Sequence, residues 1–337
     1  MKTYGKIWSL IVMATFWLAS DAAAASWFAG SVAAPSSDMS STGSDEIRQT
    51  GDRVFSRNRQ QWSVVQRTGD GGLKLVSARP PQRKVASDGI PDGYIVTDRA
   101  DNRAWYAQPT TRYGHGALGD RIEAGSLVVN MAGKTLRLEL PPSQVFEDIA
   151  PRIADVNGDG IADFVTIRSS LTEGAAIAVY TVRNGKLVES AATQPIGLPS
   201  RWLNIAGIAD FNGDGRLDIA QVIKPHLTGE LEILTLKNGG FQSIAQVSGL
   251  SNHIIGSAEL NMSAVADVNG DGVMDLVLPR FGQGALTAYS FRAKPVKLFE
   301  VAIPNRIKTA IGVERLGGQP VFVFGDGTGA LVTVQSR

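Results

Sequence analysis

Short apolar, β-branched segments separated by polar turns recur along this chain. The clearest run predicts four strands, at residues 205–210, 217–223, 230–236 and 241–247, with KNGG as the last turn. Tight Gly-containing turns between alternating segments are typical of β-hairpins. Residues 164–193 and 276–302 repeat the pattern, and no long stretch beyond the N-terminus has helical periodicity. Four antiparallel strands per repeat predict an all-β propeller of four-stranded blades.

Two less regular units flank these three. In the first, YIVT (94–97) is expected as the second strand, SLVVNM and TLRLELP as the third and fourth, and 98–125 as an insertion of the length usual for a lid or binding element. The unit that starts at residue 312 is one strand short, and QWSVVQ (61–66) or LKLVSA (73–78) could complete it. This predicts about five blades, with six or seven as alternatives.

The string DxNGDGxxD occurs three times, at 155–163, 210–218 and 267–275. Each copy carries side-chain oxygens at positions 1, 3, 5 and 9 and Gly at position 6, an arrangement suited to Ca²⁺, which takes six to eight oxygen ligands. We therefore expect about three Ca²⁺ ions, with a backbone carbonyl at position 7 of each loop. The alternative is an Asx/Gly turn without metal. The predicted ligands are Asp155, Asn157, Asp159, Ile161, Asp163, Asp210, Asn212, Asp214, Arg216, Asp218, Asp267, Asn269, Asp271, Val273 and Asp275.

These loops differ from EF-hands, which need a bidentate Glu at position 12 and flanking helices. Position 12 is Thr166, Gln221 or Leu278, and the residues after each loop are apolar and partly β-branched, as in a strand. A DxNGDGxxD loop followed by a short strand resembles the FG-GAP/VCBS repeats of integrin-like β-propellers. The resemblance covers about residues 84–337 and implies a propeller, usually of seven blades. It says little about function, because such folds serve many roles.

The N-terminus has the pattern of an export signal. Lys2 and Lys6 precede an apolar run from Ile7 to Ala19, and Ala23 and Ala25 fit a small-residue cleavage site. We expect residues 1–25 to be a signal peptide, 26–50 a flexible Ser/Ala/Gly-rich spacer and 51–337 the propeller. The alternative is an uncleaved anchor. The mature protein is then periplasmic or secreted from a bacterium, with no stable membrane span.

Composition narrows the classes of function. The chain has 33 Lys and Arg, 32 Asp and Glu, and no Cys. Loss of Lys2, Lys6 and Asp21 with the signal would balance the charges, which argues against nucleic acid as a general partner. Without Cys there is no lipobox to acylate, no disulfide and no thiol catalysis. Motifs such as GxSxG, HExxH and the P-loop are also missing.

Strand order places the three histidines together. In an up-and-down blade, the loops after the second and fourth strands lie opposite the DxNGDGxxD loops. A site for a carboxylate, phosphate or sugar on this face would use His115, Arg201, Trp202, His226 and His253. The alternative is residues scattered over a polar surface.

Two functions remain open. One is a non-catalytic module that binds a protein or glycan in the cell envelope. The other is an envelope hydrolase or lyase that uses the histidine-bearing face. The oligomeric state stays open.

Overall fold

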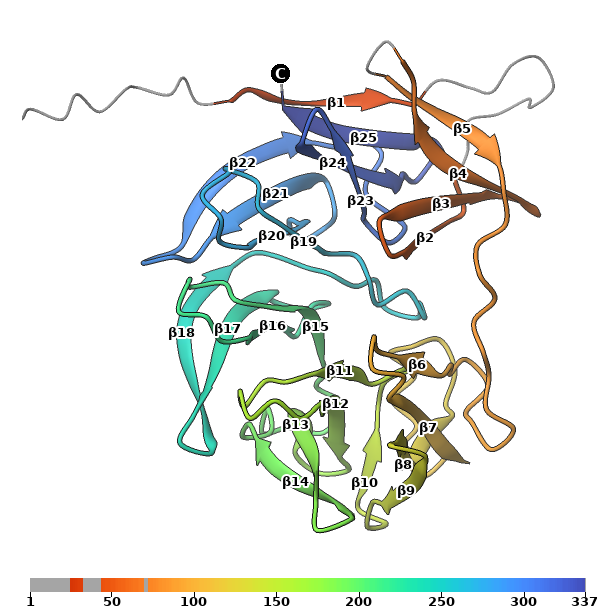
Figure 1. Cartoon of the computed structure of the whole chain (residues 1–337), viewed down its shortest axis with the longest axis vertical. Coiled ribbons are helices and arrows are strands. Elements are labelled where there is room, and N and C mark those ends of the chain that lie inside the picture. Colours follow the sequence, from red (N-terminus) through yellow and green to blue (C-terminus); the bar gives the residue numbers. More distant parts are fainter. Residues whose placement is uncertain (1–24, 33–43, 70–71, 337) are drawn as a thin grey trace, which may run out of the picture.

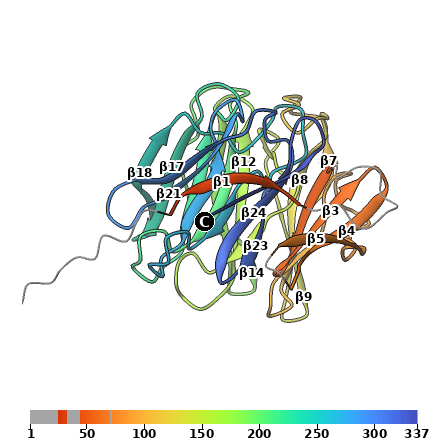
Figure 2. The same cartoon turned by 90° about the horizontal axis from the view of Figure 1, so that it is seen from above.

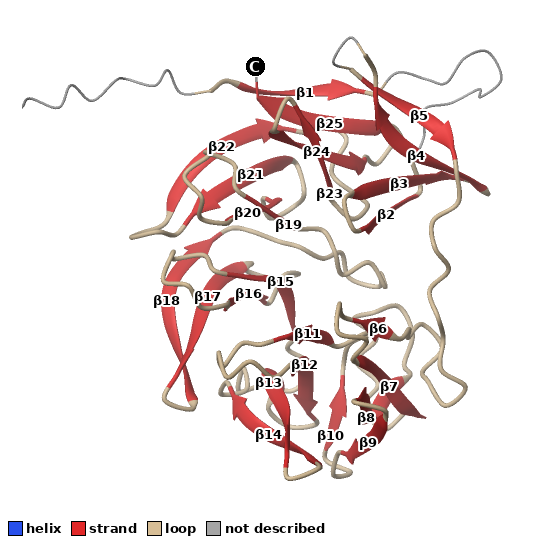
Figure 3. Cartoon of the chain, viewed as in Figure 1, coloured by secondary structure: helices blue, strands red, loops and turns tan. Residues whose placement is uncertain are grey.

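The computed structural model describes residues 25–32, 44–69 and 72–336, and Figure 1 shows the path of the chain. Within these residues the regular elements are all β-strands (Figure 3), and none of the described segments is a helix able to cross a membrane. The predicted signal peptide falls almost wholly on residues 1–24, outside the described residues. The fold is therefore all-β, as the sequence predicted.

The strands form successive sets of four, each set antiparallel. The sets are β2 (Glu46–Thr50), β3 (Arg53–Asn58), β4 (Gln61–Arg67) and β5 (Leu73–Ser77); β6 (Val96–Thr97), β7 (Arg103–Thr110), β8 (Glu123–Met131) and β9 (Lys134–Glu139); β11 (Arg152–Ala154), β12 (Asp163–Ser170), β13 (Gly174–Arg183) and β14 (Lys186–Ala192); β15 (Leu203–Ala209), β16 (Asp218–Ile223), β17 (Glu230–Lys237) and β18 (Gly240–Ser248); β19 (Ala264–Ala266), β20 (Asp275–Pro279), β21 (Ala285–Ser290) and β22 (Val296–Ala302); and β23 (Gly312–Leu316), β24 (Gln319–Gly325) and β25 (Leu331–Ser336) with β1 (Trp27–Ser31). β10 (Gln144–Phe146) pairs with β8 and β12 and so joins the second and third sets into one sheet.

The sets are arranged around a central space, as Figure 1 shows, and Figure 2 gives the same molecule turned by 90°. One cavity there is lined by the first strands β2, β6, β19 and β23, and a second by β6, β11 and β15. The cores lie between neighbouring sheets, where Leu231 and Ile233 of β17 cluster with Leu276 and Leu278 of β20. The arrangement is propeller-like, with the first strand of each set facing the centre.

The described residues contain six such sets, not the five of the main prediction. Neither QWSVVQ nor LKLVSA supplies the missing strand of the last set, because they are β4 and β5 of a complete set of their own. The strand that completes the last set is β1, which pairs antiparallel with β25 from Trp27↔Ser336 to Ser31↔Val332. The reason is aromatic packing, because the Trp27 ring stacks on Phe299 at 4.4 Å and on Phe322 at 6.0 Å.

The expected spacer at 26–50 is also corrected, since β1 and β2 lie within it. Its Ser/Ala/Gly-rich composition hid residues that pack, among them Ile47, which is 2% exposed. Residues 33–43 lie outside the described residues.

The expected insertion at 98–125 contains β7, which pairs with β8 over most of its length. YIVT is therefore in the first strand of its set, not the second, because the second strand falls inside the supposed insertion. The preceding stretch, with Asp88, forms no loop of the DxNGDGxxD type. Asp88 instead accepts a hydrogen bond from Trp105 Nε1 at 2.9 Å and pairs with Arg137.

Candidate functional site

The three DxNGDGxxD loops share one hydrogen-bond pattern. In the first, the Asp155 carboxylate accepts from the backbone N–H of Gly158 at 2.8 Å, Asp159 at 3.1 Å and Gly160 at 2.8 Å. Both glycines have positive φ, 75° and 82°, which favours Gly over any residue with a side chain. Asp210 and Asp267 make the equivalent contacts in the other loops.

The middle positions also point their oxygens at backbone amides. The side-chain oxygens of Asn157, Asn212 and Asn269 accept from the N–H two residues on, at 2.8–3.0 Å. The Asp at position 5 in turn accepts from the N–H of position 7, which is Ile161, Arg216 or Val273. The repeated sequence thus gives three loops of the same local conformation.

The last Asp of each loop begins a strand and is buried. Asp163, Asp218 and Asp275 are each 0% exposed. Oδ2 of Asp218 accepts from Phe211 N at 3.2 Å and Oδ2 of Asp275 from Val268 N at 2.8 Å. Their Oδ1 atoms are buried and accept no hydrogen bond of normal geometry within the described residues, although the hydroxyl groups of Thr235 and Ser290 lie near the carboxyl groups of Asp218 and Asp275. Burial raises the pKa of both carboxyl groups to about 6.

This donor set fits a hard cation in its chemistry. Each loop supplies three carboxylates, an amide oxygen and a backbone carbonyl, and two loops hold a buried oxygen with unused bonding capacity. As placed, however, no three His, Asp or Glu side chains of the described residues converge on a common point for a metal. Binding a cation would redirect some carboxylate contacts from the backbone amides to the ion.

At the other end of the strands, the predicted histidines come together. β15 runs from Leu203, next to Trp202, to Ala209, next to Asp210, so the tryptophan and the second loop lie at opposite ends of one strand. The Trp202 ring stacks on His226, with centroids 5.8 Å apart, and meets His253 edge-on at 4.7 Å.

The two histidines form a chain of hydrogen bonds with a defined direction. His253 Nε2 lies 2.7 Å from the Ser257 carbonyl and must donate to it, so His253 Nδ1 is the acceptor for His226 Nε2 at 2.6 Å. Burial lowers the pKa of His226 to about 4 and that of His253 to about 3. Both imidazoles are therefore neutral at neutral pH.

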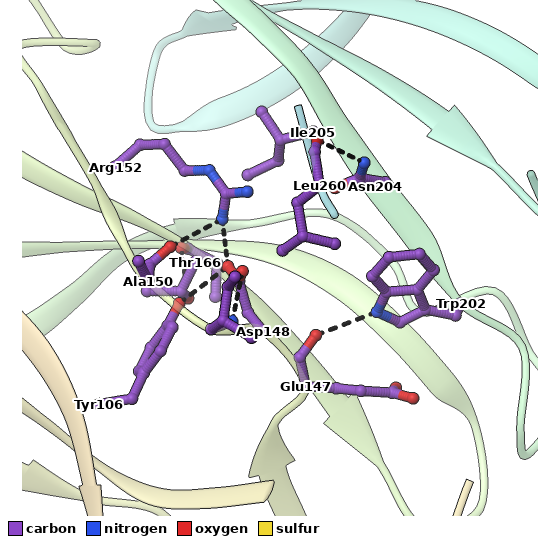
Figure 4. A network of polar contacts seen from close by, with 12 residues as sticks. Tyr106, Glu147, Asp148, Ala150, Arg152, Thr166, Trp202, Asn204, Ile205 and Leu260 are labelled. Carbon is purple, nitrogen blue, oxygen red and sulfur yellow. Dashed lines mark hydrogen bonds and ion pairs between the residues drawn. The ribbon is translucent and has the colours of Figure 1, made fainter. Parts of the chain in front are cut away.

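Glu147 ties the third histidine to this cluster. Its side chain is 0% exposed, and Oε1 lies 2.5 Å from Nδ1 of His115, while Ser169 donates to Oε2. Its backbone carbonyl accepts from Trp202 Nε1 at 3.0 Å (Figure 4). Desolvation by burial raises the pKa of Glu147, against the lowering effect of His115. No sequence motif marks Glu147, which reaches the cluster only because β10 joins two sheets.

Arg201 stands apart from the cluster. Its guanidinium donates to the Ser200 carbonyl at 3.0 Å. Four of the five predicted residues thus come together, namely His115, Trp202, His226 and His253, and they lie at the strand ends opposite the DxNGDGxxD loops.

A family model described as an FG-GAP-like repeat matches residues 149–220, from before β11 into β16. The chain contains an FG-GAP-like repeat. The matched residues include the loops that start at Asp155 and Asp210, and the loop at Asp267 carries the same motif outside them. A comparison of the sequence with curated proteins found no match.

Solved structures resemble the chain at low identity. The exotype rhamnogalacturonan lyase YesX has a TM-score of 0.46 and 14% identity, over 80% of this chain and 54% of that one. A Bacillus licheniformis rhamnogalacturonan lyase has 0.45 and 13%, over 82% and 57%. BBS1N in complex with ARL6DN has 0.44 and 10%, over 85% and 74%. The chain spans a little over half the length of these two lyases.

Proposed function

We propose that the protein is an exported β-propeller that binds calcium in its three DxNGDGxxD loops and acts as a non-catalytic binding module in the bacterial cell envelope. The FG-GAP-like repeat supports the fold part of this proposal. The N-terminal signal pattern supports export to the periplasm or the medium.

One observation carries the calcium assignment. Asp218 and Asp275 each bury a carboxylate oxygen without a partner, and such an oxygen is costly to leave unpaired. A Ca²⁺ ion held by positions 1, 3, 5, 7 and 9 of each loop would satisfy it. The ion would also relieve the repulsion among three carboxylates on one short turn.

The test is a count of bound metal. Full-length mature protein dialysed against calcium and then against buffer should retain about three Ca²⁺ per chain if each loop holds one. Asp218→Asn should lower the count by one. Asp326→Asn is the matched control, because Asp326 makes similar contacts to Thr328 N and Ala330 N in a turn that lacks the motif. Retention of no calcium would remove the assignment.

The face opposite the calcium loops is the proposed contact surface for a protein or glycan. Large apolar side chains project there from four loops: Leu198 is 56% exposed, Leu227 57%, Ile255 64% and Phe281 45%. Exposed apolar groups gathered on one face are typical of interaction sites. With His226 beside Leu227, this face offers both apolar and polar contacts.

A substitution on each face separates the two surfaces. Leu227→Asp with Ile255→Asp should abolish retention of envelope components by the immobilised protein. Val296→Asp is the control, since Val296 is 48% exposed but lies at the start of β22, on the side of the calcium loops. Equal retention by both variants would argue against the proposed contact surface.

A second candidate function rests on the His115–Glu147 pair. A buried carboxylate that orients an imidazole is an arrangement used for general-base catalysis, and His226 is a neutral imidazole close by. A hydrolase or lyase at this face would act on phosphoesters or polysaccharides and lose activity in His115→Ala. Purified protein with no such activity would favour the binding module.

A further inference from the structure

The centre of the ring holds a cavity of about 950 Å³, within the size range of ligand pockets. Its walls are the first strands β2, β6, β19 and β23 together with residues 81–83. These segments come from both halves of the chain and face one central space, with β6 across it from β2, β19 and β23 (Figure 1). The cavity is distinct from the calcium loops and from the histidine cluster.

The lining is rich in guanidinium groups. Four arginines line the cavity, Arg48, Arg67, Arg83 and Arg315, against a single acidic residue, Asp52. Arg48 is paired with Glu46 at 2.8 Å, and Arg315 donates one bond to the Gly318 carbonyl.

Arg67 and Arg83 are different, because within the described residues neither side chain makes a hydrogen bond or an ion pair. Arg83 lies over the ring of Tyr94, with its guanidinium carbon 4.3 Å from the centroid. That contact orients the guanidinium plane and leaves its N–H groups free to donate. Two guanidinium groups without a hydrogen-bond or ion-pair partner in one cavity, one of them held against Tyr94, are suited to a carboxylate or phosphate.

Acidic groups behind the lining do not cancel this charge. Glu46 pairs with Arg48 and with Arg57, which lies outside the cavity lining. Glu314 is 7% exposed, and burial raises its pKa, with the Val54 amide and Arg67 acting in the opposite sense. Desolvation by burial also raises the pKa of Glu259, with Arg83 acting in the opposite sense. Asp52 is the one carboxylate in the lining itself, so the positive side chains outnumber it there.

The rest of the polar lining favours a hydroxylated ligand. Thr50, Gln82 and Thr97 line the cavity, and their side chains make no hydrogen bond within the described residues. Hydroxyl and carboxamide groups both donate and accept, which matches the hydroxyl groups of a sugar.

We propose that this cavity binds an acidic oligosaccharide, with Arg67 and Arg83 holding a carboxylate and the Thr and Gln side chains contacting sugar hydroxyls. The assignment goes beyond the proposed function, since it names a ligand class and a second site. It does not depend on calcium in the loops or on the histidine face.

Calorimetry on the full mature protein tests it, with trimers of galacturonate, glucuronate and mannuronate as probes. Each has a carboxyl-reduced, neutral counterpart as control. At least one uronate trimer should bind, and its neutral counterpart should not. Arg67→Gln and Arg83→Gln should each weaken binding by about tenfold or more, as expected for a lost charge-assisted hydrogen bond. Arg183→Gln, an exposed arginine at the end of β13, should bind as the parent does.

Added salt should weaken binding of the uronate trimer, because the guanidinium groups of Arg67 and Arg83 are partly open to solvent. Arg67→Lys and Arg83→Lys, which keep the charge but not the planar fork, should bind with intermediate affinity. Thermal melts check that every variant is folded.

Three results would overturn the proposal: no binding of any uronate trimer, equal binding of the neutral trimers, or unchanged affinity in folded Arg67→Gln and Arg83→Gln. Binding of an acidic peptide or inorganic phosphate alone would also overturn it. The calcium count is independent, so failure here is separable from failure of the proposed function.

Discussion

At the scale of single residues, the two ends of β15 and its neighbours bury polar groups in different ways. His253 uses both ring nitrogens, one toward Ser257 and one toward His226. Asp218 and Asp275 each keep one buried oxygen with no partner among the described residues. A buried side chain whose donors and acceptors are all paired is typical of a structural role. A buried acceptor without a donor needs another partner, such as a water molecule or an ion. Near the histidines, the buried amide oxygens of Asn204 and Asn252 also have no partner among the described residues, so unpaired acceptors occur at both ends of β15.

The neutral histidines make stability depend on pH. The folded pKa of His253, about 3, lies below the value near 6.5 of an unfolded chain, so the unfolded state takes up the proton first. Its contribution is complete above pH 6.5 and is lost as pH falls toward 3. At pH 5 the loss from His253 alone is about 2 kcal/mol. Urea unfolding in EGTA at pH 7 and pH 5 measures it.

The control for this experiment is His253→Asn, which cannot titrate. The raised pKa of Glu147 acts in the opposite sense, and His115 lies close by, so the informative quantity is the difference between parent and variant. His253→Asn should have a lower free energy of unfolding than the parent at pH 7. Between pH 7 and pH 5 its free energy of unfolding should fall by less than that of the parent. The same pH dependence in both proteins would show that His253 is not the group responsible.

At the scale of elements, one loop is held by a close backbone approach. Gly229, between β16 and β17, has φ of 65°, and a Cβ added there would lie 2.0 Å from the Leu250 carbonyl oxygen. Gly239, in the next hairpin, has φ of 77° but nothing within 4 Å. A side chain at either position is disfavoured by the positive φ. At Gly229 the added Cβ would also clash with the Leu250 carbonyl.

Gly229→Ala and Gly239→Ala therefore separate the two effects. Each should cost about 1–2 kcal/mol for the left-handed conformation. Gly229→Ala should cost about 1–3 kcal/mol more, because the loop must move away from Leu250. Chemical denaturation compares the two, and equal losses would mean that the loop relaxes without cost.

The same scale explains what the sequence could predict. The ten strands predicted between 164 and 302 follow from apolar period and short turns, and all ten lie where expected, whereas the short β19 in the same range was not predicted. β6 covers only Val96 and Thr97, which is too short to show a period. The prediction for this set therefore placed the first strand as the second. Strand order was enough to bring His115, His226 and His253 to one face, but the packing that adds Glu147 is a tertiary contact without a local signal.

At the scale of the whole molecule, pairing between distant segments completes the last set of strands. β1 covers the edge of β25, and an uncovered edge strand is open to pairing with other chains. The arrangement of the sets also brings Arg48, Arg67, Arg83 and Arg315 to one cavity. No pattern in the sequence marks either feature, because each joins residues far apart along the chain.

Trp27→Ala tests the closing strand. Trp27 is partly buried against Phe299 and Phe322, so its removal should cost about 2–3 kcal/mol, below the 3–5 kcal/mol typical of a fully buried aromatic residue. Phe281→Ala, at a side chain that is 45% exposed, should change stability by less than about 1 kcal/mol. Urea unfolding of both variants gives the comparison, and no loss in Trp27→Ala would mean that β1 does not contribute to closure.

Calcium should stabilise the ring as a whole, because its three loops lie in three successive sets of strands. By mass action, each occupied site adds about 2.7 kcal/mol at a hundredfold excess of free Ca²⁺ over its dissociation constant. Thermal melts in calcium and in EGTA should therefore differ clearly. Asp214→Ala should lower the midpoint in calcium by less than EGTA lowers that of the parent, since it empties one loop while each set contacts mainly its neighbours. A midpoint that EGTA leaves unchanged would contradict a stabilising role for calcium, and a full loss from Asp214→Ala alone would show that the three loops act as one cooperative unit.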